Sequence, residues 1–142
     1  MKSKFLNSGR YVIAKNLVGS DMPLNCMYVT YGPQEMAEAP ESSGRFFDQL
    51  ADQPGCGYAR VAISSHFVKP NGEIEFHAIV TEDDLVGDMP STDTKLTSAT
   101  LAHMKGVHAA DDVFVYSSVL KNTIPVKTGS IMVISMKLGL GA

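Results

Sequence analysis

The chain has 142 residues, a formal net charge of −3 and 44% hydrophobic residues. This length and apolar content fit one domain, residues 1–142, able to bury about two-thirds of the surface that the unfolded chain exposes. The acidic balance, with no run of Lys or Arg, argues against nucleic acid or an anionic membrane as a partner. We therefore expect neither of these partners.

Cysteine content and apolar runs indicate the compartment. Cys26 and Cys56 are too few for a disulfide framework, so free thiols in a reducing cytoplasm are expected. Polar residues such as Asn7 and Lys15 interrupt any apolar core of a signal peptide. No apolar run approaches the roughly 20 residues of a membrane-spanning helix. These features predict synthesis in the cytoplasm and no membrane partner.

The first predicted element is a helix over about residues 10–18. Ile13 and Leu17 recur four residues apart, which is the spacing of one face of an amphipathic helix. Gly19 follows, where a glycine commonly ends a helix. A short amphipathic helix is therefore expected near the N-terminus.

A strand is predicted next, over residues 25–31, "NCMYVTY". Alternation places Met27, Val29 and Tyr31 on one of its faces. The following segment, about 32–44, is rich in Pro, Gly, Glu and Ser, which is typical of a long surface loop.

A second helix, barely two turns long, is predicted in "SSGRFFDQLADQPG". Ser43 can act as its N-cap, and the "QPG" sequence ends it. Phe47, Leu50 and Ala51 form its apolar stripe, so this side should face the core.

Beyond Gly55 the pattern has period two, which indicates strands. The clearest unit is a hairpin in "HFVKPNGEIEFHAIV", where Pro70-Asn71-Gly72 supplies a tight turn. Further strands are predicted in "YARVAISS", "LTSATLAHM", "DVFVYSSVL" and "IMVISMKL". Six or more short strands with little helix predict a mainly β fold, an antiparallel β-sandwich or barrel-like domain with one or two short helices near the N-terminus.

Candidate metal ligands are scattered. Acidic loops can bind calcium, but the spacing of an EF-hand is absent, so a solvated loop is the favoured interpretation. Histidines can bind zinc, but no H-x-H or H-E-x-x-H pattern places two of them together. We expect no metal site at the acidic residues Glu82, Asp83, Asp84, Asp88 and Asp93 or at the histidines His66, His77, His103 and His108.

The nearest approach to a catalytic nucleophile is Cys56 in "PGCGY". Its flanking glycines would allow an exposed, sharply turned thiol. A turn before a strand explains the same glycines, and the strand–turn–helix context of a nucleophile elbow is missing. We therefore expect no catalytic residue and no enzymatic activity.

The order of segments carries a resemblance. An opening "LNSGRYVIAKNLVGS" precedes "MYVTYG", then "YARVAI" with its hairpin, and a closing "VYSSVLKNTIPVKTGSIMVISMKLGL". This order resembles small virion structural proteins of tailed bacteriophages, of the head-decoration or tail-appendage kind. Those chains are similar in placing a helix before a strand that ends in Gly. They also close on two strands joined by a "V-x-x-G" turn, here Val126 to Gly129.

The resemblance implies a non-enzymatic structural protein, with no cofactor, that assembles as a homo-oligomer on a bacteriophage particle. Capsid decoration, a minor capsid role and a tail component all fit. Its partners would be copies of itself and other virion proteins, and its location the virion after synthesis in the host cytoplasm. Contact surfaces rather than a convergent polar pocket are typical of such proteins.

Two other functions stay open. One is a cupin-like or lipocalin-like barrel that binds a small molecule, with an interior lined by Tyr58, Arg60, His77 and His103. The other is a small hydrolase that uses Cys56 or a histidine site.

The last strand carries the candidate interface. Residues 131–134 are apolar on both faces, which predicts burial at the sheet centre or beneath a neighbouring subunit. From Ser135 onward only one face is apolar. The candidate residues for contact with a partner are Ile131, Val133, Met136, Leu138 and Leu140.

Overall fold

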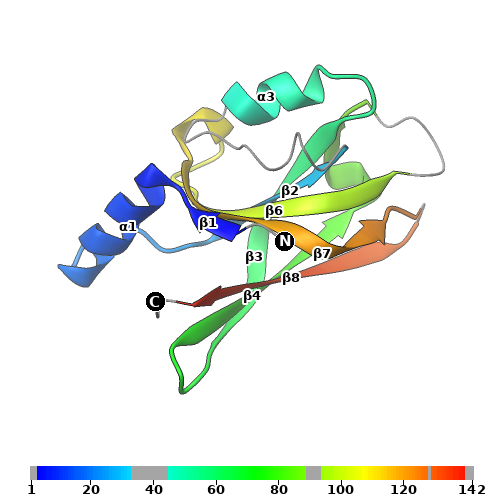
Figure 1. Ribbon diagram of the computed structural model, residues 1–142. Helices are drawn as coiled ribbons and strands as arrows, with labels where there is room; N and C mark the ends of the chain where they lie inside the picture. The colour runs from blue at the N-terminus through cyan, green and yellow to red at the C-terminus, as the bar shows by residue number, and fades with distance from the viewer. Residues whose placement is uncertain (1–2, 33–44, 89–93, 128, 140–142) are drawn as a thin grey trace.

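A computed structural model describes residues 3–32, 45–88, 94–127 and 129–139. The chain forms an antiparallel sheet of eight strands that curls into a half-barrel, with two short helices (Figure 1). The predicted mainly β, barrel-like fold with short helices is confirmed. No helix in the described part of the chain is long and apolar enough to cross a membrane.

The sheet has the strand order β1-β7-β6-β2-β3-β4-β8, and β5 pairs with β3 beside this path. The strands are β1 (Ser3–Phe5), β2 (Cys26–Tyr31), β3 (Gly57–Val68), β4 (Glu73–Thr81), β5 (Leu85–Gly87), β6 (Lys95–His103), β7 (Val113–Pro125) and β8 (Ile131–Gly139). The helices are α1 (Asn7–Leu17) and α3 (Arg45–Ala51), with single 3-10 turns at Glu82–Asp84 and Ala109–Asp111. Strands β1 and β5 were not predicted, because three residues are too few to display a period of two.

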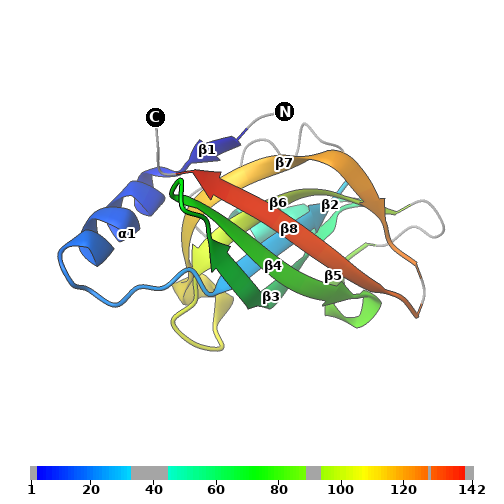
Figure 2. The same ribbon diagram turned by 90° about the horizontal axis from the view of Figure 1, so that it is seen from below.

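The core lies inside the curl. Figure 2 shows β4 and β8 crossing β2 and β6, so that the inner faces of these strands meet. The inner face of β2, predicted as Met27, Val29 and Tyr31, is buried there. Apolar side chains of β4 and β8 fill the same space, so the interior of the half-barrel is packed rather than hollow: Phe76, Ala78, Val80, Met132, Ile134, Met136 and Leu138.

A second, aromatic cluster covers the outer face of β2. Phe47 of α3 packs against Tyr28, with ring centroids 4.4 Å apart, and against Phe114 at 5.0 Å. Phe47 and Leu50 are buried, which confirms the predicted apolar face of this short helix. The expected cap, Ser43, and most of the predicted polar loop lie outside the described residues.

The interior differs from the one expected for a small-molecule barrel. Tyr58 belongs to the outer aromatic cluster, and Arg60 on the same face pairs with Asp112. His103 bonds through Nδ1 to the Pro23 carbonyl oxygen, and His77 lies on the outer face of β4. The prediction that these side chains line the interior is wrong for Tyr58, Arg60 and His77, because the alternate residues of β3 and β4 face inward. His103 is at the end of β6, on the same side as Leu101 of the core.

Helix α1 begins three residues earlier than predicted and buries a different side. Leu17 is 82% exposed, whereas Val12 is completely buried. The contact is made by Gly9, where an added Cβ would lie 2.1 Å from the backbone oxygen of Val115 in β7. The close approach of Gly9 to the backbone of β7, rather than a predicted apolar stripe, therefore sets which side of α1 faces the sheet. Its expected end is confirmed, because Gly19 has a φ of 101°.

The predicted hairpin is confirmed between β3 and β4, with Gly72 at a φ of 89° in its turn. The place predicted for residues 131–134 at the sheet centre is wrong. Strand β8 lies at the end of the strand order, and its burial alternates strictly. The start of β8 is apolar on both faces, but within this chain only the inner face is buried. The outer face, with Ile131 and Val133, is exposed.

Candidate functional site

The outer face of the β4–β8 pair carries an apolar patch. Ile79 of β4 is 47% exposed and lies directly opposite Val133 of β8, which is 62% exposed. Ile131, two residues earlier in β8, is 66% exposed and lies opposite Thr81. We call Ile79, Ile131 and Val133 the edge patch. Three neighbouring aliphatic side chains at a sheet edge form a surface suited to contact with another protein.

Polar side chains continue the same face beyond the edge patch. The hydroxyl of Ser135 donates to Glu75 Oε1 at 3.0 Å, and His77 Nε2 lies 3.3 Å from that oxygen. These bonds, the one from Ser135 foremost, lower the pKa of Glu75. Lys137 stands opposite Glu75 in the strand register, yet the carboxylate is approached instead by Lys69. Lys137 thus leaves its positive charge toward solvent.

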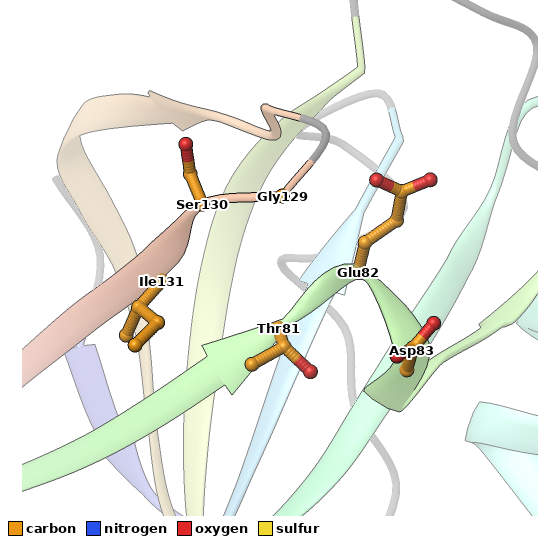
Figure 3. Close-up of a pocket in the computed structure, with 6 residues that line it drawn as sticks. All are labelled: Thr81, Glu82, Asp83, Gly129, Ser130 and Ile131. Carbon is orange, nitrogen blue, oxygen red and sulfur yellow. The ribbon is translucent and has the colours of Figure 1, made fainter.

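A pocket of about 390 Å³ lies at the other end of the edge patch (Figure 3). It is lined by the end of β4, the 3-10 turn that follows and the start of β8: Thr81, Glu82, Asp83, Gly129, Ser130 and Ile131. Figure 3 shows the Glu82 carboxylate and the Ser130 hydroxyl projecting on the same side, and Ile131 pointing away from them.

The acidic turn at this pocket contains one carboxylate that caps the turn and two that have no ion-pair partner among the described residues. Asp84 accepts bonds from the Thr81 backbone N–H at 2.8 Å and from its hydroxyl at 3.1 Å, closing a capping box. Glu82 and Asp83 make no ion pair with any described residue. The turn therefore presents two uncompensated negative charges beside Ile131, and a cationic group is the ligand that this chemistry favours.

The five predicted interface residues do not lie on one surface of the structure. Ile131 and Val133 point outward in the edge patch, whereas Met136 and Leu138 are buried in the chain's own core. Leu140 lies outside the described residues. The strict alternation of β8 explains the division, because odd and even positions face opposite sides.

Sequence reasoning missed one member of the patch, Ile79. The signal was present, because Ile79 is the apolar member of the otherwise polar register that includes Glu75 and His77. Only the pairing of β4 with β8 brings it beside Val133. A pattern within one strand could not provide that neighbour.

Within the described ranges, no three His, Cys, Asp or Glu side chains are grouped as metal ligands would be. Asp84 caps its own turn, and Asp88 Oδ2 accepts a 2.7 Å bond from the Gly55 backbone N–H. Asp93 lies outside the described residues.

Cys56, the candidate nucleophile, is buried, and both cysteines are free thiols. Burial, with a smaller contribution from Asp88, raises the pKa of Cys56, so that its nucleophilic thiolate form is disfavoured. The following glycine has a packing role, because a Cβ on Gly57 would lie 2.3 Å from the Tyr31 hydroxyl oxygen. This crowding, together with a φ of 73° at Gly55, accounts for both glycines of the "GCG" pattern.

A buried polar network lies on the outer face of β2 and β3. Asp112 accepts bonds from the Tyr28 hydroxyl and Arg60 Nε, each at 2.6 Å, and from Arg60 Nη2 at 2.9 Å. Arg60 Nη2 also donates to the Gly106 carbonyl at 2.7 Å. The carboxylate raises the pKa of the guanidinium, and burial followed by the bond to Asp112 raises the pKa of Tyr28. The network anchors the β6–β7 connection to β3, which is a structural task.

Comparison of the chain with protein-family models, with curated proteins and with solved structures found no match. The site must therefore be interpreted from its own geometry.

Proposed function

We propose that this chain is a non-enzymatic virion structural protein that assembles as a homo-oligomer on a bacteriophage particle, as a capsid decoration, minor capsid or tail component. The supporting observation is the edge patch, where Ile79, Ile131 and Val133 are exposed together at the sheet edge. Proteins that work by contact area keep such apolar groups at their surface for a partner to cover. Its partners are copies of itself and other virion proteins.

The packed interior favours this proposal over a small-molecule barrel. A ligand-binding barrel needs an open lumen, but Ile134 and Leu138 of β8 fill the space against Met27 and Leu101. The pocket of Figure 3 lies at the rim, between a turn and a strand end, and not inside the curl.

The proposed virion function is tested on purified phage particles. Phage particles purified from a lysate of the host should contain the chain at a fixed copy number, measured by quantitative mass spectrometry. Labelled antibody on the same particles should place it on the head or on the tail by electron microscopy. Absence of the chain from particles that contain the other structural proteins would overturn the proposal.

A further inference from the structure

Helix α1 carries large apolar side chains on the side that faces away from the sheet. Tyr11 and Val18 lie seven residues apart, opposite Gly9 on the helix, and are 57% and 80% exposed. Leu17 beside them is 82% exposed. We call Tyr11, Leu17 and Val18 the helix face. Apolar groups gathered at a surface in this way are typical of a contact with a partner.

Positive charge flanks the helix face. Arg10 is exposed, and Lys15 Nζ lies 5.7 Å from the centroid of the Tyr11 ring. Neither side chain makes an ion pair with a described residue. The first 20 residues hold four of the 12 basic residues of the chain and none of the 15 acidic ones, so the rest of the chain has a net charge of −7. The charge that complements the helix face is therefore carried by the remainder of the same chain.

An acidic surface lies at the other end of the molecule. Figure 2 shows α1 at one end of the half-barrel and β5, with the 3-10 turn before it, at the opposite end. Glu82 and Asp83 make no ion pair with a described residue, Lys127 in the turn before β8 included. Asp88 accepts its bond from an uncharged backbone N–H, and Val86 between these carboxylates is 52% exposed. We call Glu82, Asp83, Val86 and Asp88 the acidic end.

We propose that copies of this chain associate head to tail, with the helix face of one copy docked on the acidic end of the next. Arg10 and Lys15 then meet carboxylates, and the apolar helix face covers Val86. A two-fold contact between two helix faces would instead bring like charges together. Because the two surfaces lie at opposite ends of the molecule, the contact is heterologous and repeats into a ring or an open tube. The inference rests on the proposed function and deepens it, because it names a second copy as partner and the mode of its assembly.

Complementary variants test the direction of the contact. Leu17→Gln with Val18→Gln removes apolar groups from the helix face, and Glu82→Lys with Asp83→Lys reverses the acidic end. In sedimentation velocity the unmodified chain should form species larger than a dimer, and each variant should raise the dissociation constant of the contact by more than about tenfold. An equimolar mixture of the two variants contains one intact helix face for each intact acidic end. It should therefore form one-to-one dimers and nothing larger.

The matched control for the helix face is Phe67→Gln with Val68→Gln. This pair removes two apolar side chains of β3 that are 55% and 62% exposed, and should leave the assembly unchanged. An unmodified chain that is monomeric or stops at a dimer overturns the inference. So does a mixture of the two variants that stays monomeric, or an equal loss of assembly in the control.

Cross-linking tests which surfaces meet. Ala14 is exposed on α1 between Tyr11 and Val18, so a short bismaleimide should join Ala14→Cys in one chain to Val86→Cys in another. The two native thiols are buried. Val107→Cys is the control for Ala14→Cys, because Val107 is 85% exposed outside both surfaces. Cross-linking of either single variant to itself, or a mixed product no more abundant than with Val107→Cys, overturns the head-to-tail contact.

An anionic lipid surface is the other partner that a basic helix with exposed apolar groups can bind. Co-sedimentation with phosphatidylserine vesicles measures this binding. Vesicle binding that is lost with Leu17→Gln and Val18→Gln, in a chain that does not associate with itself, would assign the helix face to lipid and overturn the inference.

The inference and the proposed function can fail separately. A chain that is present in particles but does not associate with itself keeps the virion function and removes the head-to-tail contact. A chain that assembles through the helix face but is absent from particles keeps the contact and removes the virion function.

Discussion

Strands β2 and β8 are similar in sequence but differ in their surroundings. Both are rich in apolar residues, "CMYVTY" in β2 and "IMVISM" in β8. Every residue of β2 is buried, since the half-barrel interior covers one face and the aromatic cluster with Phe47 covers the other. In β8 every second residue is exposed. The difference shows that an apolar strand of a single chain can have one face that the chain itself does not cover.

The largest expected effect is at Ile134, on the covered face of β8. Ile134→Asp would bury a carboxylate without a partner, at a cost of several kcal/mol against a typical stability of roughly 5–15 kcal/mol. We expect loss of the folded state by circular dichroism. Val133→Asp, one residue earlier on the exposed face, should leave the fold intact. Equal tolerance of both variants would show that the burial of β8 has been misassigned.

Weakening the aromatic cluster on the outer face of β2 should have the next largest effect. Phe47→Ala takes away the ring that packs on Tyr28 and Phe114, and should lower the free energy of unfolding by about 3–5 kcal/mol. Phe47→Leu retains most of the volume and serves as the control in urea denaturation. A small loss for the alanine variant would mean that α3 contributes little to covering β2.

Asp112 is the shared acceptor of the polar network next to the aromatic cluster. Asp112→Asn removes the charge that Arg60 and Tyr28 share, and should cost about 1–3 kcal/mol, because Arg60 is partly exposed. Urea denaturation measures the loss. Lys69→Ala breaks a surface ion pair with Glu73 and should give a change too small to resolve. Similar losses in the two variants would argue against burial as the source of the effect.

The smallest effect at neutral pH concerns the thiol of Cys26 in β2. Burial, assisted by Asp112, raises the pKa of Cys26 from 9.0 to about 12. The folded chain thus holds this proton more tightly than the unfolded chain. Its contribution to stability is complete below pH 9.0 and is lost as the pH rises to about 12.

Two measurements check this expectation. Tyrosines titrate in the same range, so the relevant quantity is the difference in unfolding free energy between the parent and Cys26→Ala as the pH rises. The difference should shrink across that window. In the native protein, iodoacetamide should modify Cys26 more slowly than Cys56. Faster modification of Cys26 would indicate that the cover over β2 opens.

Period-two patterns predicted the strands and their inward residues well, because each pattern is contained in a single strand. They identified Met27, Val29 and Tyr31 as one buried face and the "KPNG" turn as a hairpin. They could not assign β8 to an edge, because that position depends on which strands pair. The apolar 131–134 segment therefore suggested either a central strand or a strand beneath a neighbouring subunit.

The remaining differences also arise from long-range contacts. The buried side of α1 is set by Gly9 meeting the backbone of Val115, and the pair of Arg60 with Asp112 joins residues that are 52 positions apart. In the edge patch, Val133 was predicted from its own strand, whereas its neighbour Ile79 required the β4–β8 register.

The pairing of β1 with β7 has a consequence for folding during synthesis. Ser3 lies opposite Ser118, so the first strand made must wait for most of the chain before it finds its partner. The central β2 also depends on β6, with Met27 opposite Leu101, although β3 and β4 can pair with their neighbours earlier. Domains dominated by such distant pairings fold slowly, in about milliseconds to seconds. Until β6 and β7 emerge from the ribosome, the apolar face of β2 is open to wrong partners, so expression at lower temperature or with a chaperone should raise the soluble yield.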